Sequence, residues 1–92
     1  MTYNVVVVDE AKEDIAALKK SEIKAYEKVQ GFFNELKEHP KTGTGKPEMM
    51  KHGKYRGMWS RRINKKHRLV YSINDAEIVV IILTAKEHYD DK

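Results

Sequence analysis

Residues 58–83 read MWSRRINKKHRLVYSINDAEIVVIIL, in which runs of mixed apolar and polar residues precede a run that is apolar from Ile78 to Leu83. Because the helical period is lost and turn residues separate the runs, the stretches at 58–63, 67–73 and 77–83 predict three strands. The connecting turns are short and polar, Asn64-Lys65-Lys66 and Asn74-Asp75-Ala76. Because short turns of this kind join antiparallel neighbours, this stretch is predicted to form an antiparallel meander.

Upstream of the meander, the sequence predicts one strand and two helices. The run at 3–8 is apolar on both faces, which predicts a strand in the interior of the sheet. Asp9 and Ser21 are the expected N-caps of a short and a longer helix. Apolar residues recur in both helices at spacings of three and four, namely Ala11, Ile15 and Leu18 in the first and Ile23, Tyr26, Val29, Phe33 and Leu36 in the second.

The order strand, helix, helix, three strands predicts an α+β fold in which an antiparallel sheet packs against two helices. With 92 residues, the chain is expected to form a single domain, residues 1–92. The absence of cysteine excludes disulfides and thiolate metal sites, and no other ligand spacing points to a metal or a cofactor. No apolar run is long enough to cross a membrane, and no secretory signal is readable.

Positive charge is concentrated in residues 39–68, which hold ten Lys or Arg residues and a single acid, Glu48. The rest of the chain holds eight basic and thirteen acidic residues, so the net charge of +4 understates the asymmetry. A basic face of this kind attracts an anionic partner such as the phosphates of a nucleic acid. The alternative is a solvated, lysine-rich loop without a partner.

The first hairpin of the meander is predicted to bring two arginines together. If its loop is residues 64–66, Trp59 pairs with Tyr71, and Arg62 lies directly opposite Arg68 on the other face of the sheet. Like charges in that arrangement destabilise a sheet. A phosphate bound between the two guanidinium groups would offset their repulsion, so the pair would favour phosphate binding. The alternative is two arginines splayed into water.

Two further residues have the chemistry of a site that cleaves a phosphodiester. Glu48 follows a proline in an extended segment, and its carboxylate can act as the general base for a ribose 2′-hydroxyl. His88 can act as a general acid, because histidine titrates at about pH 6.5. Its neighbour Tyr89 can bond a phosphate or stack on a base. The alternatives are an ordinary surface salt bridge for Glu48 and an incidental histidine near the end of the chain.

The remaining basic residues are candidates for contacts with RNA. Lysines in the basic block are expected to contact backbone phosphates, whereas the arginine of the glycine-flanked loop is placed to touch a base or a partner. The histidine at the start of the second meander strand is expected to be structural. These candidates are Lys46, Lys51, Lys54, Lys65 and Lys66 for the phosphates, Arg56 for the loop, Arg61 as a further RNA contact, and His67 as the structural residue.

The ordered motifs of the chain resemble one family. The strings are Gly45-Lys46-Pro47-Glu48, then Lys51, Trp59-Ser60-Arg61-Arg62-Ile63, His67-Arg68-Leu69-Val70-Tyr71 and finally His88-Tyr89. This combination resembles the YoeB/Txe branch of the RelE/ParE toxin superfamily, the toxins of type II toxin–antitoxin pairs. The resemblance is close from residue 45 to residue 71 and again at the end of the chain. The helical half of the chain shares with the family its pattern of apolar residues but no distinctive sequence motif.

The resemblance implies a microbial-RNase-like fold and a ribosome-dependent messenger-RNA endonuclease. By position, Glu48 corresponds to the general base of the family, Arg68 to its phosphate-stabilising arginine, His88 to its general acid and Tyr89 to the adjacent tyrosine. Arg62 and Lys51 correspond to supporting basic residues. The implied reaction is attack by the 2′-hydroxyl on the adjacent phosphorus, without metal or cofactor, which leaves a 2′,3′-cyclic phosphate.

The resemblance also implies partners and a compartment. The toxin is expected to act on the 70S ribosome and its messenger RNA in the cytoplasm. A cognate antitoxin, YefM-like, Phd-like or related, is expected to neutralise it, and operator DNA is expected to be bound only through the antitoxin complex. Homodimers are known in this branch, which makes a second copy of the chain a further expected partner.

The chain departs from the pattern of the family at its end, where Asp90-Asp91-Lys92 follow the His-Tyr pair and the interval from Tyr71 to Tyr89 is about two residues longer. Two other functions remain open at this point. One is a ParE-like toxin that inhibits DNA gyrase and cuts nothing, and the other is a nucleic-acid-binding repressor. The positions of Glu48, Arg68 and His88 favour the nuclease over both.

Overall fold

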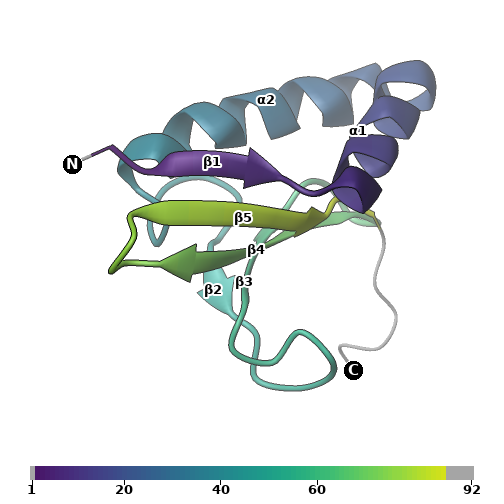
Figure 1. Cartoon of the computed structure of the whole chain (residues 1–92). Helices are drawn as coiled ribbons and strands as arrows, with labels where there is room; N and C mark the ends of the chain where they lie inside the picture. The colour runs from purple at the N-terminus through teal and green to yellow at the C-terminus, as the bar shows by residue number, and fades with distance from the viewer. Residues whose placement is uncertain (1, 87–92) are drawn as a thin grey trace.

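The computed structural model of the protein describes residues 2–86. Two helices lie along one side of a five-stranded sheet (Figure 1), and the predicted α+β class is confirmed. The elements in chain order are β1 (Asn4–Val7), α1 (Asp9–Ser21), α2 (Ile23–Glu38), β2 (Glu48–Met49), β3 (Trp59–Arg62), β4 (Arg68–Asn74) and β5 (Val79–Thr84). Neither helix is long and apolar enough to cross a membrane within the described part of the chain.

The sheet has the strand order β1-β5-β4-β3-β2 and is mixed rather than wholly antiparallel. β1 runs parallel to β5, whereas the pairs β3–β4 and β4–β5 are antiparallel as predicted, and β2 adds a further antiparallel pair with β3. β1 is also an edge strand, so the expectation of an interior strand is wrong. Val5 and Val7 pack against the core, while Val6 points to the other face and is 42% exposed. The valines of β1 therefore make both of its faces apolar, although only the face toward the core is buried.

The core lies between the helices and one face of the sheet. Buried helix residues meet buried residues of β4 and β5 there: Ala11, Leu18, Ala25, Val29, Phe32 and Leu36 from the helices, and Leu69, Tyr71, Val80 and Ile82 from the strands. The predicted apolar stripe of α2 is wrong at Ile23, which is exposed, and it omits Phe32, which is fully buried, whereas Phe33 packs against the core while only partly buried. The helical period places both phenylalanines near the sheet, and only packing decides between them.

Neither predicted N-cap forms. Val8 precedes α1, and Asp9 is already its first helical residue, without a side-chain cap. Ser21 is the last residue of α1, and its hydroxyl donates to the carbonyl of Ala17. Glu22 alone separates the two helices, so the chain turns there without a cap from either predicted residue.

The β3–β4 hairpin has the predicted register, in which Trp59 pairs with Tyr71 and Arg62 with Arg68. Asn64 stabilises its short loop, because its side-chain oxygen accepts from the backbone N–H groups of Lys66 and His67. The structural role expected for His67 is confirmed by a 2.8 Å bond between its Nε2 and Glu22 at the junction of the helices.

The second hairpin differs from the prediction at its turn. β5 begins at Val79 rather than at residue 77, because residues 75–78 form the turn. Ile78 adopts a positive φ of 57°, and the side chain of Asn74 accepts a hydrogen bond from the N–H of Glu77. The predicted turn at residues 74–76 therefore starts one residue early and ends two residues early.

Candidate active site on the open face of the sheet

The pairing of the strands places four chemically active side chains on one face. Glu48 in β2 pairs with Ser60 in β3, and Arg62 in β3 pairs with Arg68 in β4. Directly paired residues, and residues two apart along a strand, share a face of a sheet. Glu48, Ser60, Arg62 and Arg68 therefore all lie on the face that the helices leave uncovered. β2 was not predicted as a strand, since two residues are too short for a periodic pattern.

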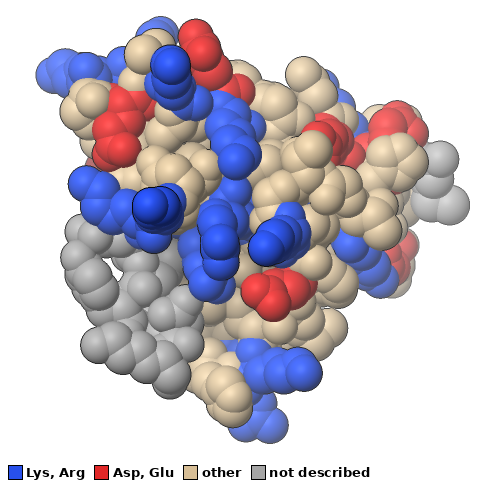
Figure 2. All heavy atoms as spheres, turned by 180° about the vertical axis from the view of Figure 1, so that it is seen from behind, with Lys and Arg blue, Asp and Glu red and all other residues tan. Residues whose placement is uncertain are grey.

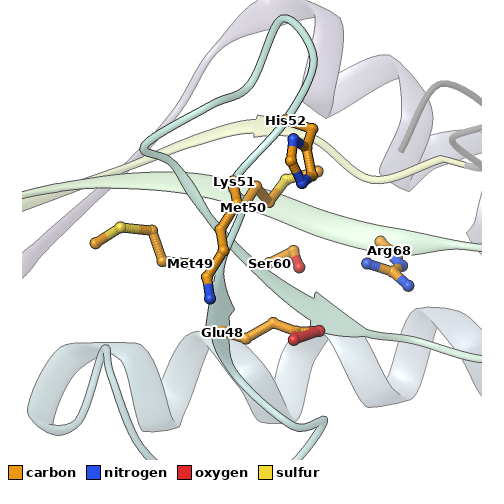
Figure 3. Close-up of a pocket in the computed structure, with 7 residues that line it drawn as sticks. All are labelled: Glu48, Met49, Met50, Lys51, His52, Ser60 and Arg68. Carbon is orange, nitrogen blue, oxygen red and sulfur yellow. The ribbon is translucent and has the colours of Figure 1, made fainter. Parts of the chain in front are cut away.

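A pocket of about 310 Å³ opens on this face, lined by Glu48, Met49, Met50, Lys51, His52, Ser60 and Arg68. In Figure 3 the carboxylate of Glu48 and the guanidinium group of Arg68 both point into the space above Ser60, and His52 lies across that space from Glu48. Met49 points away from it. Three predicted site residues, Glu48, Lys51 and Arg68, are thus brought together in one pocket.

The side chains of Glu48, Lys51 and His52 form no hydrogen bond or ion pair with any residue between 2 and 86. The carboxylate of Glu48 is exposed at the rim, while Arg68 is half-buried. An unpartnered carboxylate facing a guanidinium group across a small pocket can accept a proton on one side of a bound phosphate while positive charge stabilises the other side. The pocket therefore holds two of the groups expected for cleavage of a phosphodiester, a carboxylate and a guanidinium group.

The loop that leads into β2 is held from the opposite face by Arg61. The Arg61 side chain is fully buried. Its Nε donates to the Tyr71 hydroxyl at 3.1 Å, and Nη1 donates to the Glu35 carboxylate. The two terminal nitrogens also donate to three loop carbonyls, those of His39, Thr42 and Thr44. Since the guanidinium group is enclosed and its donors are occupied, the expectation that Arg61 contacts RNA is wrong.

Glu35 is the counter-charge of Arg61 and also binds the loop itself. Its carboxylate accepts from the backbone N–H of Thr44 at 2.9 Å and from the Thr44 hydroxyl at 2.7 Å. Burial alone would raise the pKa of Glu35, but the bonds from Thr44 and Arg61 outweigh it and leave the pKa below the ordinary value. The Glu35 carboxylate of α2 is therefore ionised at neutral pH and holds the loop that leads into β2.

Gly45 lets this loop pass close to the core. Its φ is +80°, and a Cβ atom there would lie 2.6 Å from Cζ of Phe32. The carbonyl of Gly45 accepts from the N–H of Arg62 at 2.7 Å, which ties the loop directly to β3. Only a residue without a side chain fits this conformation and this contact. Gly45 therefore fixes the path of the loop, and with it the position at which Glu48 joins the sheet.

Cations surround the pocket on this side of the molecule. Figure 2 shows Lys and Arg side chains gathered in a band over one face, with few acids among them. The exposed basic residues of the block are Lys41, Lys46, Lys51, Lys54, Arg56, Arg62, Lys65 and Lys66. Of the predicted RNA contacts, all except Arg61 are accessible to a large anionic partner, and their contact with RNA stays a prediction.

The predicted acid His88 and its neighbour Tyr89 lie outside the described residues. The chain that leads to them is anchored up to Lys86. The carboxylate of Asp14 accepts from the Thr84 hydroxyl at 2.8 Å and from the Ala85 N–H at 3.1 Å. The N–H of Arg68 donates to the carbonyl of Lys86 at 3.4 Å. The last described residues therefore lie against β4 beside Arg68.

Besides Met49, Met50 and Ser60, the sequence interpretation missed one pocket residue with a titratable side chain, His52. It follows Lys51 and precedes Gly53, whose φ is +82°. A histidine four residues after Glu48, in a glycine-containing loop, is a weak signal that no spacing rule selects. Its position across the pocket from Glu48 adds a second titratable side chain to the site.

Comparison with known proteins points to one family. The profile described as "YoeB-like toxin of bacterial type II toxin-antitoxin system" matches residues 8–89. "Toxin YoeB" of Escherichia coli K12 is 32% identical over 81 residues, which cover 88% of this chain and 93% of that protein. A solved YoeB dimer from Staphylococcus aureus is 31% identical with a TM-score of 0.80, and covers 97% of this chain and 100% of its own. A YoeB-YefM complex from the same organism is 30% identical with a TM-score of 0.77 and the same coverage.

Proposed function

The chain belongs to the family of YoeB-like toxins of bacterial type II toxin–antitoxin systems, and we propose that it is a ribosome-dependent endoribonuclease that cleaves messenger RNA in the ribosomal A site. The observation that carries the proposal is the pocket in which Glu48 and Arg68 face each other above Ser60. A groove that merely binds nucleic acid needs cations, and an unpartnered carboxylate there would repel phosphate. A nuclease needs that carboxylate as its base.

In the proposed reaction Glu48 removes the proton from a ribose 2′-hydroxyl. The 2′-oxygen then attacks the adjacent phosphorus, and the bond from phosphorus to the 5′-oxygen breaks. His88 donates a proton to the leaving 5′-oxygen, assisted by Tyr89, which orients the site. The products are a 2′,3′-cyclic phosphate and a 5′-hydroxyl, so protons and charge balance without a metal or cofactor.

Arg68 and Arg62 stabilise the negative charge that develops on the phosphate. Their direct cross-strand pairing places two positive groups side by side, which costs stability in the absence of an anion. Guanidinium groups bind phosphate oxygens through two parallel hydrogen bonds. A phosphate between the two side chains could accept hydrogen bonds from both guanidinium groups, and this favours tight binding as the phosphate gains charge.

The anchored end of β5 supports the role assigned to His88. Glu87 alone separates His88 from Lys86, whose carbonyl is bonded to the backbone of Arg68. The proposed acid thus follows in sequence the segment that is bonded to the backbone of Arg68, while the proposed base comes from β2.

The surrounding cations would hold the message and the ribosome. Lys46, Lys51, Lys54 and Arg56 are exposed around the pocket and suit contacts with backbone phosphates. Binding through such contacts weakens steeply with salt. This division, with few residues for chemistry and many for docking, fits an enzyme whose substrate is presented by a large RNA assembly in the cytoplasm.

We also propose a cognate antitoxin as the controlling partner. The similar Staphylococcus aureus toxin is found with YefM in one structure and as a dimer in another. By this similarity the present chain would bind a YefM-like or related antitoxin, would reach operator DNA only through that complex, and would form a homodimer in its absence. The chain itself would be the toxic, RNA-cleaving component.

The test is primer extension on a defined message in a purified translation system, with the intact protein and Glu48→Gln compared. We expect cuts within A-site codons that vanish with the variant. Equal cutting by both proteins would remove Glu48 from the chemistry. No cuts with either protein would contradict the nuclease and favour a ParE-like inhibitor, which a gyrase supercoiling assay would then test.

A further inference from the structure

The Ser60 side chain lines the pocket, and its hydroxyl group has no hydrogen-bond partner among the described residues. The residue as a whole is only 2% exposed. The other two fully buried hydroxyl-bearing residues are both satisfied. Tyr71 donates to the carbonyl of Pro40 and accepts from Arg61, and Thr84 donates to Asp14. The Ser60 hydroxyl differs from these two because it faces a pocket and not a protein partner, so a molecule bound in the pocket can form a hydrogen bond with it.

The pocket is where that ligand would sit. Ser60 is the polar residue at its floor, directly paired with Glu48 on one side and with Val70 on the other. In Figure 3 its hydroxyl oxygen points into the space between the Glu48 carboxylate and the Arg68 guanidinium group. Val70 has no polar side-chain atom, so the sheet offers the hydroxyl no acceptor on that side. The unsatisfied group is thus aimed at the centre of the site.

We propose that the Ser60 hydroxyl binds the substrate, by donating a hydrogen bond to a non-bridging oxygen of the scissile phosphate. The proposal rests on the function proposed above and adds a substrate contact to it. If Glu48 takes the proton of the 2′-hydroxyl and Arg68 stabilises the phosphate, the phosphorus lies between them, above Ser60. A hydroxyl group both donates and accepts, and a phosphate oxygen supplies the acceptor that is missing in the free protein.

The contact would strengthen during the reaction. Hydrogen bonds to charged oxygens are shorter and stronger than neutral ones, and charge on the non-bridging oxygens grows as the 2′-oxygen attacks. Ser60 is held by the central part of the sheet, between β2 and β4, so its hydroxyl needs no rearrangement to make this bond. The expected effect therefore falls on kcat more than on KM.

The first experiment compares Ser60→Ala with Ser72→Ala. Ser72 is a serine of the neighbouring strand β4 that does not line the pocket, so the two changes are chemically identical. On ribosomes programmed with a defined message, we expect Ser60→Ala to lower kcat by about 10–100-fold, the loss of one hydrogen bond to a charged group. Ser72→Ala should stay within about twofold of the intact protein.

Unfolding measurements separate binding from a structural role. Because the Ser60 hydroxyl has no protein partner, Ser60→Ala should unfold at the same denaturant concentration as the intact protein, or at a higher one. A variant that loses stability and activity together would overturn the proposal. So would full activity of Ser60→Ala in an assay in which the intact protein cuts the message.

A sulfur substitution identifies the atom that is contacted. A message with one phosphorothioate at the cleaved position is prepared as its two separate stereoisomers. One isomer should slow the intact protein, while the same sulfur should slow Ser60→Ala several-fold less, because the bond that it weakens is already absent. Equal slowing of both proteins by both isomers would refute the contact. Failure of the intact protein to cut the unmodified message would instead refute the nuclease.

Discussion

Arg61 and Arg62 are neighbours in β3, yet they serve the two faces of the sheet in different ways. Arg61 is fully buried against the helices, and its guanidinium group binds Glu35, Tyr71 and loop carbonyls. Arg62 is exposed on the open face, opposite Arg68, and its side chain bonds to none of the described residues. The covered face thus satisfies its charge within the protein, whereas the open face leaves its charge available to a substrate.

This contrast shows where stability and where activity should reside. The hydrogen bonds of Arg61 hold the loop that precedes Glu48. Changes to Arg61 should therefore destabilise the protein or displace the proposed base, Glu48. Arg62 and Arg68 lie opposite each other on the open face, away from the core, so changes there should leave the fold intact and alter cleavage. A pair of substitutions at adjacent positions can test the division.

The largest effect is expected from Arg61→Met. Removal of the guanidinium group leaves the Glu35 carboxylate without its counter-charge and several carbonyls without their donor, and breaking a buried ion pair costs about 3–5 kcal/mol. Arg62→Met should change the free energy of unfolding by no more than about 0.5 kcal/mol. Denaturant titration of both variants measures the difference. Equal losses of stability would contradict the division between the two faces.

The second effect concerns Gly45, where the loop approaches the core. Gly45→Ala combines a left-handed backbone with a Cβ atom 2.6 Å from Phe32, and we expect it to cost about 2–4 kcal/mol. Gly31→Ala is the matched control, because that glycine lies in α2 with nothing within 4 Å of the added atom. The control should gain up to about 1 kcal/mol from its better helix propensity. A tolerated Gly45→Ala would mean that the loop is not held against the core.

The third effect falls on the open face and on activity alone. If Arg62 and Arg68 share a phosphate, Arg62→Lys should lower cleavage by about 10–100-fold, because lysine keeps the charge but loses the paired hydrogen bonds. Lys65→Ala, which removes a full charge from the exposed hairpin loop, should have a smaller effect that salt reproduces. A mild, salt-like effect of Arg62→Lys would refute the shared phosphate.

The smallest effect is a pH dependence of stability on the covered face. The pKa of Glu35 lies below its ordinary value of 4.5 in the folded protein, so its contribution is present above that pH and is lost as the pH falls through the folded-state pKa. Glu35→Gln should therefore lower stability at neutral pH and lose less on acidification from about pH 6 to about pH 3. Thermal unfolding across this range measures both. An unchanged acid dependence would contradict the role of Glu35.

The same two faces explain which features the sequence could predict. The β3–β4 register followed from a three-residue turn, and Asn64 supplies the local reason for it. The pairing of Arg62 with Arg68 came directly from that register. The same register assigned Arg61 to the face of Leu69, but an arginine is so often exposed that its burial required knowledge of Glu35, which lies 26 residues away.

Features that depend on tertiary packing were missed. β2 is two residues long, and it forms because the loop bound by Arg61 and Glu35 places Glu48 beside Ser60. β1 is an edge strand with valines on both faces, and strand composition does not distinguish an edge from an interior position. The chemistry of the site was thus readable from residue types, while the pocket that unites Glu48, His52 and Ser60 required the fold.

The central claim, that the open face cleaves RNA through the 2′-hydroxyl, has a direct test on the substrate. A message with a single 2′-deoxynucleotide at the cleaved position is placed in the A site and compared with the all-ribose message. Loss of cutting at the modified position, with neighbouring cuts retained, is the result expected if Glu48 activates the 2′-hydroxyl. Undiminished cutting at the deoxynucleotide would contradict the mechanism and, with it, the role assigned to the pocket.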